Sequence, residues 1–191
     1  LSADEIGDYA QQHALAQELL NAPTLFDGKT KFVQLPALNK DFSRGFTVEA
    51  LVRFDEFQAW SRIIDLGNGP DSQNILLANE AKTNNLSLMI INNGQQYLIK
   101  AQNVLPKGEW VYVAATIQPN GTARLYVNGV EKANGPLALP VTIPRNNNFI
   151  GKSNWSNDAL FKGAISFVRL WQIALSPVEI AQAARQYCYP E

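Results

Sequence analysis

The sequence predicts an all-β protein, a two-sheet antiparallel sandwich with an N-terminal helix and a short C-terminal helix. From Thr24 to Trp171, short segments alternate hydrophobic and polar residues with the period of two that is typical of strands. Helical patterns with capping signals occur near the two ends of the chain. Five Asn-Gly dipeptides, which favour tight turns between antiparallel strands, occur at residues 68–69, 93–94, 120–121, 128–129 and 134–135.

The composition of the 191 residues, 46% hydrophobic and 17% charged, excludes a disordered chain. Lys and Arg number 16 against 17 Asp and Glu, so the net charge is −1 and lacks the positive field of a nucleic-acid binder. One His and one Cys exclude a zinc finger, an iron–sulfur cluster and a disulfide framework within the chain. No apolar run approaches the about 20 residues that span a bilayer, so we expect no membrane insertion.

Residues 1–21 are predicted to form a helix apart from the main domain, which we place at residues 22–191. The stretch 1–6 is similar to 175–180, and in each a serine precedes a glutamate by three positions, which is the capping box of a helix start. The two copies lie too far apart for a solenoid repeat and suggest repetition of whole domains. We therefore expect residues 1–21 to be a linker or the tail helix of an upstream domain.

Strands are expected throughout the central region. The strict alternation of residues 46–54 predicts a half-buried strand, whereas residues 110–117 are apolar on both faces and predict a strand covered on both sides. Trp110 and Trp171 lie within strand patterns and are expected in the core. Further strands are expected at residues 24–26, 31–35, 62–66, 74–78, 85–91, 95–101, 122–128, 148–151 and 163–171.

The sequence does not favour an enzyme. The one histidine, His13, lies in the predicted N-terminal helix and cannot supply a Ser–His–Asp or Cys–His arrangement to the strand region. No strand carries the alternating carboxylates that a sandwich glycosidase needs. The sequence also lacks the glycine-rich motifs that cradle phosphates. We therefore expect a protein that binds a partner without transforming it.

The candidate ligand-binding residues are two tryptophans in polar, loop-like sequence and their neighbours. Trp60 precedes Arg62 by two positions, and Trp155 follows Asn154 and precedes Asp158 by three. A sugar ring presents an apolar face that stacks on indole and hydroxyls that bind polar side chains. We expect the two tryptophans to stack on a sugar while Arg62, Asn154 and Asp158 form hydrogen bonds to it.

Two other interpretations of these residues stay open. In one, each tryptophan folds down and caps an end of the sandwich. In the other, Arg62 forms a structural pair with Asp65 and does not bind a ligand. The loop at residues 67–74 offers oxygen donors but lacks the repeated acidic positions of an EF-hand.

The order and spacing of several stretches make the chain similar to a laminin-G-like domain of the concanavalin A-like lectin/glucanase group. The resemblance covers about residues 24–187 and implies a two-sheet jelly roll with a concave face and a loop-lined rim. The matching stretches are Leu25–Gly28, Phe32–Pro36, Phe46–Val52, Trp60–Gly67, Gly108–Ala114, Leu125–Gly129, Phe149–Trp155, Phe161–Trp171 and Ala174–Ser176.

The resemblance implies a non-catalytic carbohydrate-binding or adhesion module of a larger extracellular protein, secreted or at the cell surface. Its partner would be a glycan or a glycosylated surface. The alternative is a protein–protein interaction or spacer domain that docks to neighbouring protein domains in a multidomain assembly. The repeated capping-box helix favours this alternative, because such a helix can pack between successive domains.

Calcium is the one cofactor that the resemblance suggests. Many relatives hold a structural calcium ion near the Asp-Gly turn of the first strand, here Asp27 and Gly28, with an aspartate from the last strand. That last-strand position is taken here to be Ser166, a weak neutral ligand where a hard dication prefers carboxylate. Calcium at Asp27 and Gly28 is therefore disfavoured.

Overall fold

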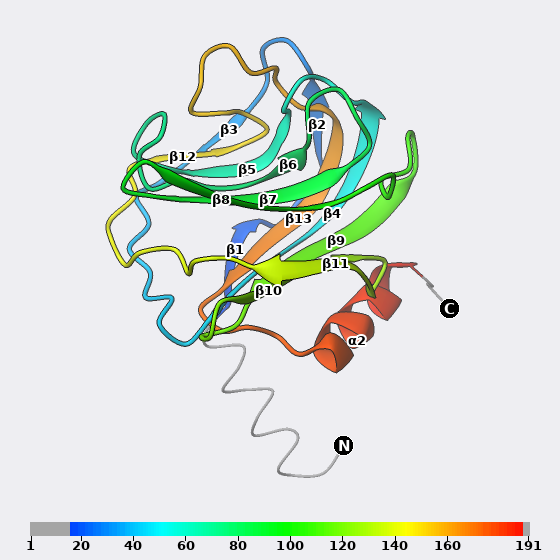
Figure 1. The fold of residues 1–191 in the computed structure, drawn as a ribbon. Coiled ribbons are helices and arrows are strands. Elements are labelled where there is room, and N and C mark those ends of the chain that lie inside the picture. Colours follow the sequence, from blue (N-terminus) through cyan, green and yellow to red (C-terminus); the bar gives the residue numbers. More distant parts are fainter. Residues whose placement is uncertain (1–15, 189–191) are drawn as a thin grey trace.

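Two antiparallel β-sheets face each other in the computed structural model of the chain, which describes residues 16–188 (Figure 1). The first sheet has seven strands in the order β1-β13-β4-β9-β10-β11, and β2 also pairs with β13. The predicted all-β sandwich is confirmed. The strands of this sheet are β1 (Ala16–Leu20), β2 (Thr24–Asp27), β4 (Phe46–Glu56), β9 (Trp110–Ile117), β10 (Thr122–Val127), β11 (Val130–Pro136) and β13 (Lys162–Trp171).

The second sheet has six strands in the order β3-β12-β5-β6-β7-β8. Its central strands follow one another in the chain and pair as successive antiparallel neighbours, so β5, β6, β7 and β8 form a meander. This sheet provides the surface on which the candidate site is built. Its strands are β3 (Val33–Leu35), β5 (Arg62–Gly67), β6 (Ile75–Asn79), β7 (Leu86–Asn92), β8 (Gln95–Ala101) and β12 (Asn147–Ile150).

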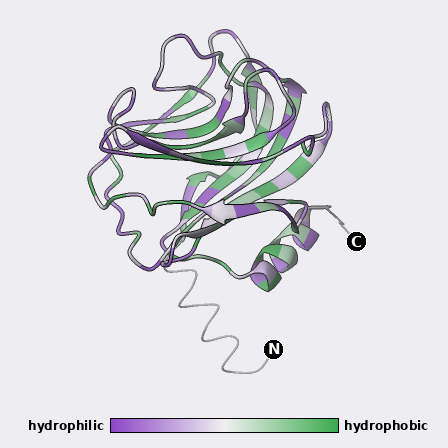
Figure 2. Ribbon diagram, in the orientation of Figure 1, coloured by the Kyte–Doolittle hydropathy of each residue, from purple (hydrophilic) through white to green (hydrophobic). Residues whose placement is uncertain are grey.

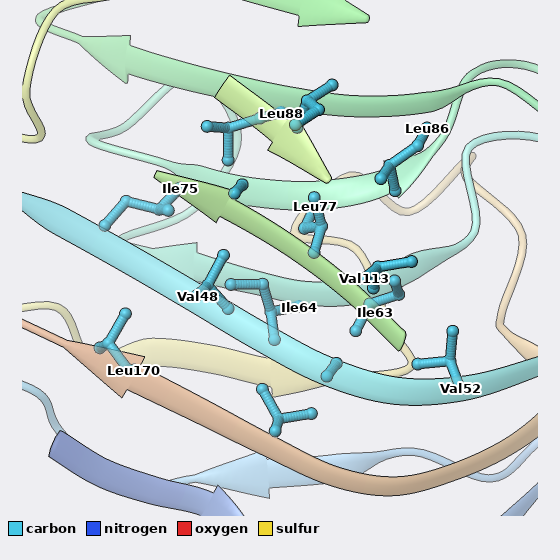
Figure 3. Packing of buried hydrophobic residues seen from close by; sticks show 14 of the residues in the cluster. Val48, Val52, Ile63, Ile64, Ile75, Leu77, Leu86, Leu88, Val113 and Leu170 are labelled. Carbon is cyan, nitrogen blue, oxygen red and sulfur yellow. The ribbon is translucent and has the colours of Figure 1, made fainter. Parts of the chain in front are cut away.

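Hydrophobic side chains at alternate strand positions fill the space between the sheets. Val48 and Val52 of β4 lie opposite Ile64, Ile75 and Leu77 of the six-stranded sheet, and all five are fully buried (Figure 3). Figure 2 shows the same alternation as changing hydropathy along the strands. Truncating a large buried side chain to alanine costs about 2–5 kcal/mol. Packing in the interior therefore stabilises the six-stranded sheet on which the candidate site lies.

Helix α2 (Pro177–Cys188) covers the outer face of the seven-stranded sheet, where Ile180 packs in a cluster that includes Trp171. The predicted short C-terminal helix and its capping box are confirmed. The Ser176 N–H donates to Glu179 Oε2 at 2.6 Å, and the Glu179 N–H donates to Ser176 Oγ at 3.2 Å. Within the residues that the structure describes, no helix is both long and apolar enough to cross a lipid bilayer.

The prediction of a helix is wrong at residues 16–20, which form the edge strand β1. This strand pairs with β13, and the Nε of Arg169 donates to Glu18 Oε1 at 2.5 Å across the pair. Pairing between residues distant in sequence therefore overrides the weak local preference for a helix. Residues 1–15, which hold the rest of the predicted N-terminal helix, lie outside the described residues. Their assignment to a linker or an upstream domain stays a prediction.

The outer face of β4 is more buried than the alternation predicts. The inward residues of β4 are buried as expected, but Thr47 and Glu49 of the outer face are also buried. Thr47 is bonded to the segment that leads into α2, and the Glu49 carboxylate accepts hydrogen bonds from Tyr112 and Arg169. The placement of Trp110 in the core is wrong. Its residue is 44% exposed, since it begins β9 on the outer face, where the Arg53 guanidinium lies 5.6 Å from its ring centroid. Trp171 is buried, as predicted, beneath α2.

The Asn-Gly dipeptides behave in different ways. At residues 93–94 and 128–129 both members have positive φ (51° and 79°, 50° and 79°), so each forms the turn expected of this dipeptide. At residues 120–121 only Gly121 has positive φ, so this turn differs from the other two, but it connects the antiparallel strands β9 and β10 as predicted. Residues 134–135 do not turn at all, because they lie inside β11, a polar edge strand that the hydrophobic pattern missed.

Candidate functional site

A pocket of about 260 Å³ lies on the outer face of the six-stranded sheet. Its floor contains Leu76 of β6 and Met89 of β7, which are paired neighbours. The flanking residues Ile75 and Leu77 point into the core, so Leu76 points out of the sandwich. The pocket is lined by Trp60, Arg62, Asp71, Leu76, Met89, Gln96, Trp155 and Asp158.

Two loops form the rim of the pocket. The β5–β6 loop, residues 68–74, is anchored by buried Asn74, whose Nδ2 donates to Asp65 Oδ1 and to the Gly69 carbonyl, both at 3.1 Å. At the tip of this loop, the carboxylate of exposed Asp71 accepts a hydrogen bond of 3.1 Å from Gln96 Nε2 of β8. The loop therefore reaches from β5 to β8. The second loop, residues 151–161 between β12 and β13, carries Trp155 and is called here the Trp155 loop.

Trp60 stands just before β5 in a backbone conformation that few non-glycine residues adopt. Its φ is +52°, a left-handed value that costs about 1–2 kcal/mol for an L-residue. Two hydrogen bonds hold it there. The Trp60 N–H donates to the Ala81 carbonyl at 3.0 Å, and the Trp60 carbonyl accepts from Arg62 Nη1 at 2.5 Å. Strained backbone that its surroundings hold in place is typical of ligand sites.

Arg62 is the centre of the pocket wall. Besides its bond to Trp60, its Nε donates to Asp65 Oδ2 at 3.2 Å and its Nη2 donates to Asp158 Oδ2 at 2.8 Å. Its Cζ lies 5.9 Å from the ring centroid of Trp60 and 5.5 Å from that of Trp155, within the range of cation–π attraction. One guanidinium therefore positions both indoles, and the anticipated pair with Asp65 is present.

Asp65 and Asn154 fix the Trp155 loop to the sheet. Asp65 is fully buried, and its Oδ2 accepts the Asn154 N–H at 3.0 Å while its Oδ1 accepts Asn154 Nδ2 at 2.8 Å. The same Nδ2 also donates to the Asn147 carbonyl at 3.1 Å. The structure does not bring Asn154 into the pocket lining, because its amide serves these contacts. Asn154 therefore orients the loop from behind.

Asp158, in the Trp155 loop, completes the wall of the pocket. Its Oδ2 accepts hydrogen bonds of 2.8 Å from Arg62 Nη2 and of 2.8 Å from Ser153 Oγ, and its Oδ1 takes part in neither bond. The Asp158 side chain is 21% exposed. Four of the five residues predicted from the sequence thus meet at one pocket, Trp60, Arg62, Trp155 and Asp158.

Sequence reasoning missed the floor and the far rim of the pocket. Leu76 and Met89 lie in hydrophobic strand patterns, and nothing in those patterns separates the outward residues from the core ones. Gln96 of β8 carried no signal either. Asp71 belongs to the loop at residues 67–74, whose oxygen donors are evident in the sequence, but the sequence does not indicate that Asp71 lies at the rim of a pocket.

Asp27, at the end of β2, lies at the turn where the family resemblance suggests calcium. Asp27 Oδ1 accepts the backbone N–H groups of residues 29–31 at 2.8–3.0 Å, and Oδ2 accepts Thr30 Oγ1 at 2.6 Å. These bonds, the one from the Thr30 hydroxyl foremost, hold the pKa of Asp27 well below its usual range. The strand register places Lys162 opposite Asp27, so Ser166 lies about 13 Å further along β13.

The groups around Asp27 do not fit a hard dication. The Asp27 carboxylate already stabilises a turn, and the residue opposite it, Lys162, is a cation. Lys162 in turn forms an ion pair of 2.7 Å with Glu56. Among the described residues, no three His, Cys, Asp or Glu side chains gather in a group that could hold a metal ion. That calcium is disfavoured near Asp27 stays a prediction, which a calcium titration of the protein would test.

The fold and its sequence pattern define the family. A laminin G family model, described as the concanavalin A-like lectin/glucanases superfamily, matches residues 27–181. The chain therefore belongs to this superfamily, and the resemblance found in the sequence is confirmed. A search of curated protein sequences found no match.

Solved structures with a similar fold include parts of a bacterial arabinanase and of bacterial sialidases. Domain 4 of AbnA, an extracellular GH43 arabinanase from Geobacillus stearothermophilus, in complex with arabinotriose, has a TM-score of 0.67 and 19% identity, with 88% of this chain and 87% of that chain covered. The CBM40 of the Ruminococcus gnavus IT-sialidase, bound to α2,3-sialyllactose, has a TM-score of 0.64 and 14% identity, with coverages of 81% and 97%.

A third similar structure is a larger enzyme. The NanB sialidase from Streptococcus pneumoniae, in a K499G variant, has a TM-score of 0.64 and 16% identity over 83% of this chain, but the match covers only 27% of the sialidase. At these identities the three similarities establish a shared fold.

Proposed function

We propose that this chain is a non-catalytic carbohydrate-binding module that holds a glycan in the pocket of the six-stranded sheet. The observation that carries the proposal is that Trp60 and Trp155 both lie against the buried guanidinium of Arg62 and both line the pocket. The floor beside them is formed by the aliphatic side chains of Leu76 and Met89. Indole and aliphatic surfaces suit the C–H faces of a sugar ring. The exposed carboxylate of Asp71 suits its hydroxyl groups.

The size of the pocket limits how much of a glycan it takes. Its volume of about 260 Å³ is smaller than the about 300–1,000 Å³ of sites that enclose drug-sized ligands. A single sugar ring fits, and the rest of a longer glycan would lie outside. Binding through one ring predicts modest affinity, which several linked modules would raise through avidity.

The similar structures support this function and its setting. The two neighbours of module size are described in complex with arabinotriose and with sialyllactose, and the first belongs to an extracellular arabinanase. By analogy we place this chain in a larger secreted or cell-surface protein. Fold analogy alone does not carry function, so the argument depends on the pocket and the neighbours only raise its weight.

The use of two carboxylates within the protein supports binding without catalysis. A glycosidase needs two carboxyl groups that flank the scissile bond across an open space. Asp65 and Asp158 instead share the guanidinium of Arg62, and Asp65 is fully buried. Turnover of any polysaccharide in a substrate screen of the purified chain would contradict this part of the proposal.

The test is a glycan array followed by calorimetric titration of the glycans that bind, with the wild type and two tryptophan variants. Trp155→Ala should weaken binding at least about fivefold, because the stacking of a nucleic-acid base on an aromatic side chain, a comparable contact, contributes about 1–3 kcal/mol. Trp110→Ala is the matched control, because Trp110 also lies against an arginine but far from the pocket lining. It should bind as the wild type does.

Two results would count against the proposal. Equal affinity of the wild type and Trp155→Ala would remove the pocket from the binding site. Silence across the array, with a correctly folded protein, would favour the alternative of an interaction or spacer domain that docks to neighbouring protein domains.

A further inference from the structure

The charges around the pocket are unequal. The pocket lining holds one guanidinium, that of Arg62, and two carboxylates, those of Asp71 and Asp158. In the wall, Arg62 also pairs with the buried carboxylate of Asp65. The wall and rim therefore carry two net negative charges. Whole-chain charge does not offset them, because the net charge of the protein is −1.

The guanidinium of Arg62 is largely committed to the protein's own oxygens. Recognition of a carboxylate by arginine usually uses two parallel N–H groups that face the ligand together. Here Nε, Nη1 and Nη2 each donate to a different protein oxygen, and the side chain is only 4% exposed. The second N–H groups of Nη1 and Nη2 are outside these bonds, but the low exposure of the side chain limits the access of a ligand carboxylate to them.

Two lysines of the same sheet and its loops are held elsewhere. Lys100 of β8 forms an ion pair of 2.9 Å with Glu80. The Nζ of Lys152 lies 4.4 Å from the ring centroid of Phe32 and 4.8 Å from that of Phe149, at the β3–β12 edge of the sheet. These contacts draw both ammonium groups away from the pocket.

The remaining polar groups suit hydroxyls. Asp71 is exposed at the rim. The hydrogen bonds that Asp158 accepts from Arg62 and Ser153 both go to its Oδ2, and its Oδ1 takes part in neither. Carboxylate oxygens accept strong hydrogen bonds from hydroxyl groups but repel a ligand carboxylate or sulfate. The apolar floor of Leu76 and Met89 adds no charge preference of its own.

We infer that the pocket selects uncharged glycans and discriminates against glycans that carry a carboxylate or sulfate on the bound ring. This inference rests on the proposed function and narrows its ligand class. It separates the two chemistries seen in complexes of the similar folds, because arabinotriose is uncharged whereas sialyllactose carries a carboxylate.

The test compares oligogalacturonides in the acid form with their methyl esters, together with arabinotriose and α2,3-sialyllactose, on one array and by titration. These esters remove the charge and keep the sugar ring. We expect uncharged glycans to bind and the acid forms to bind at least tenfold more weakly. Asp71→Asn should reduce the ratio of the affinity for the methyl esters to the affinity for the acid forms. A higher salt concentration should reduce this ratio too, because salt screens repulsion at an exposed rim.

The control is Asp55→Asn, which removes a carboxylate paired with Arg53 on the other sheet and should leave the ratio unchanged. Binding of the acid forms equal to or tighter than that of the esters would overturn the inference while leaving the proposed function intact. Silence toward every glycan of the array, with a correctly folded protein, would overturn the proposed function, and this inference with it.

Discussion

Arg62 and Asp158 form an ion pair of 2.8 Å that joins the start of β5 to the Trp155 loop, 96 residues further along the chain. The pair matters because its two ends carry different indoles. Arg62 bonds the carbonyl of Trp60, and Asp158 belongs to the same loop as Trp155. The spacing of the two aromatic surfaces is therefore set by a polar contact between segments that are distant in sequence.

Replacing Arg62 with methionine should destabilise the protein by about 3–5 kcal/mol, because it leaves the buried carboxylate of Asp65 without its cation. Arg53→Met is the matched control. Arg53 also lies against a tryptophan and pairs with an aspartate, but its side chain is 30% exposed, so the expected loss is at most about 1 kcal/mol. Urea unfolding of the two variants measures the difference, and equal losses would contradict the central role of Arg62.

Asn154→Ala should loosen the Trp155 loop without touching the pocket lining. The change removes the amide that donates to the buried carboxylate of Asp65 and to the Asn147 carbonyl, and a hydrogen bond to a charged group contributes about 1.5–3 kcal/mol. We expect faster hydrogen exchange across residues 151–161. Asn157→Ala, an exposed change in the same loop, should leave exchange there as it is in the wild type. Slow exchange in both variants would show that the loop is held by other contacts.

The strand positions could be predicted because alternation is a local property. Residues 46–54 and 95–101 show it within a single strand, and both lie in strands of the structure. Residues 16–20 form a strand only because β13 provides a partner 150 residues away, and no local pattern reports that pairing. Trp110 was misplaced for a related reason, since its exposure depends on where α2 ends its cover of the sheet.

The candidate site could be predicted in part. Trp60 and Trp155 stood out because large aromatic residues are unusual in polar loops. Leu76 and Met89 did not, because β6 and β7 have hydrophobic residues at successive positions, so the sequence does not tell the two faces of these strands apart. The direction of a side chain relative to the sandwich becomes known only when the sheets are paired.

Asp27 should make the stability of the protein sensitive to acid. Because its hydrogen bonds lower its pKa in the folded state, the unfolded chain binds more protons than the folded chain as the pH falls through the usual aspartate range. Stability contributed by Asp27 is therefore present above that range and is lost on acidification. Asp27→Asn should flatten the acid limb of a plot of urea midpoint against pH. An unchanged acid limb would assign the effect to other carboxylates.

Gly129→Ala should destabilise the docking of α2. Gly129 has a φ of +79°, and a Cβ atom there would lie 2.9 Å from the Cβ of Ala184 and 3.2 Å from the Cα of Ala181 in the helix. Gly94 has the same φ of +79° in an equivalent Asn-Gly turn, but a Cβ there would meet no atom within 4 Å. Gly94→Ala therefore measures the cost of the turn alone, and Gly129→Ala should lose about 1–3 kcal/mol more through overpacking. Equal thermal and urea unfolding of the two variants would mean that α2 can shift away from the turn without loss.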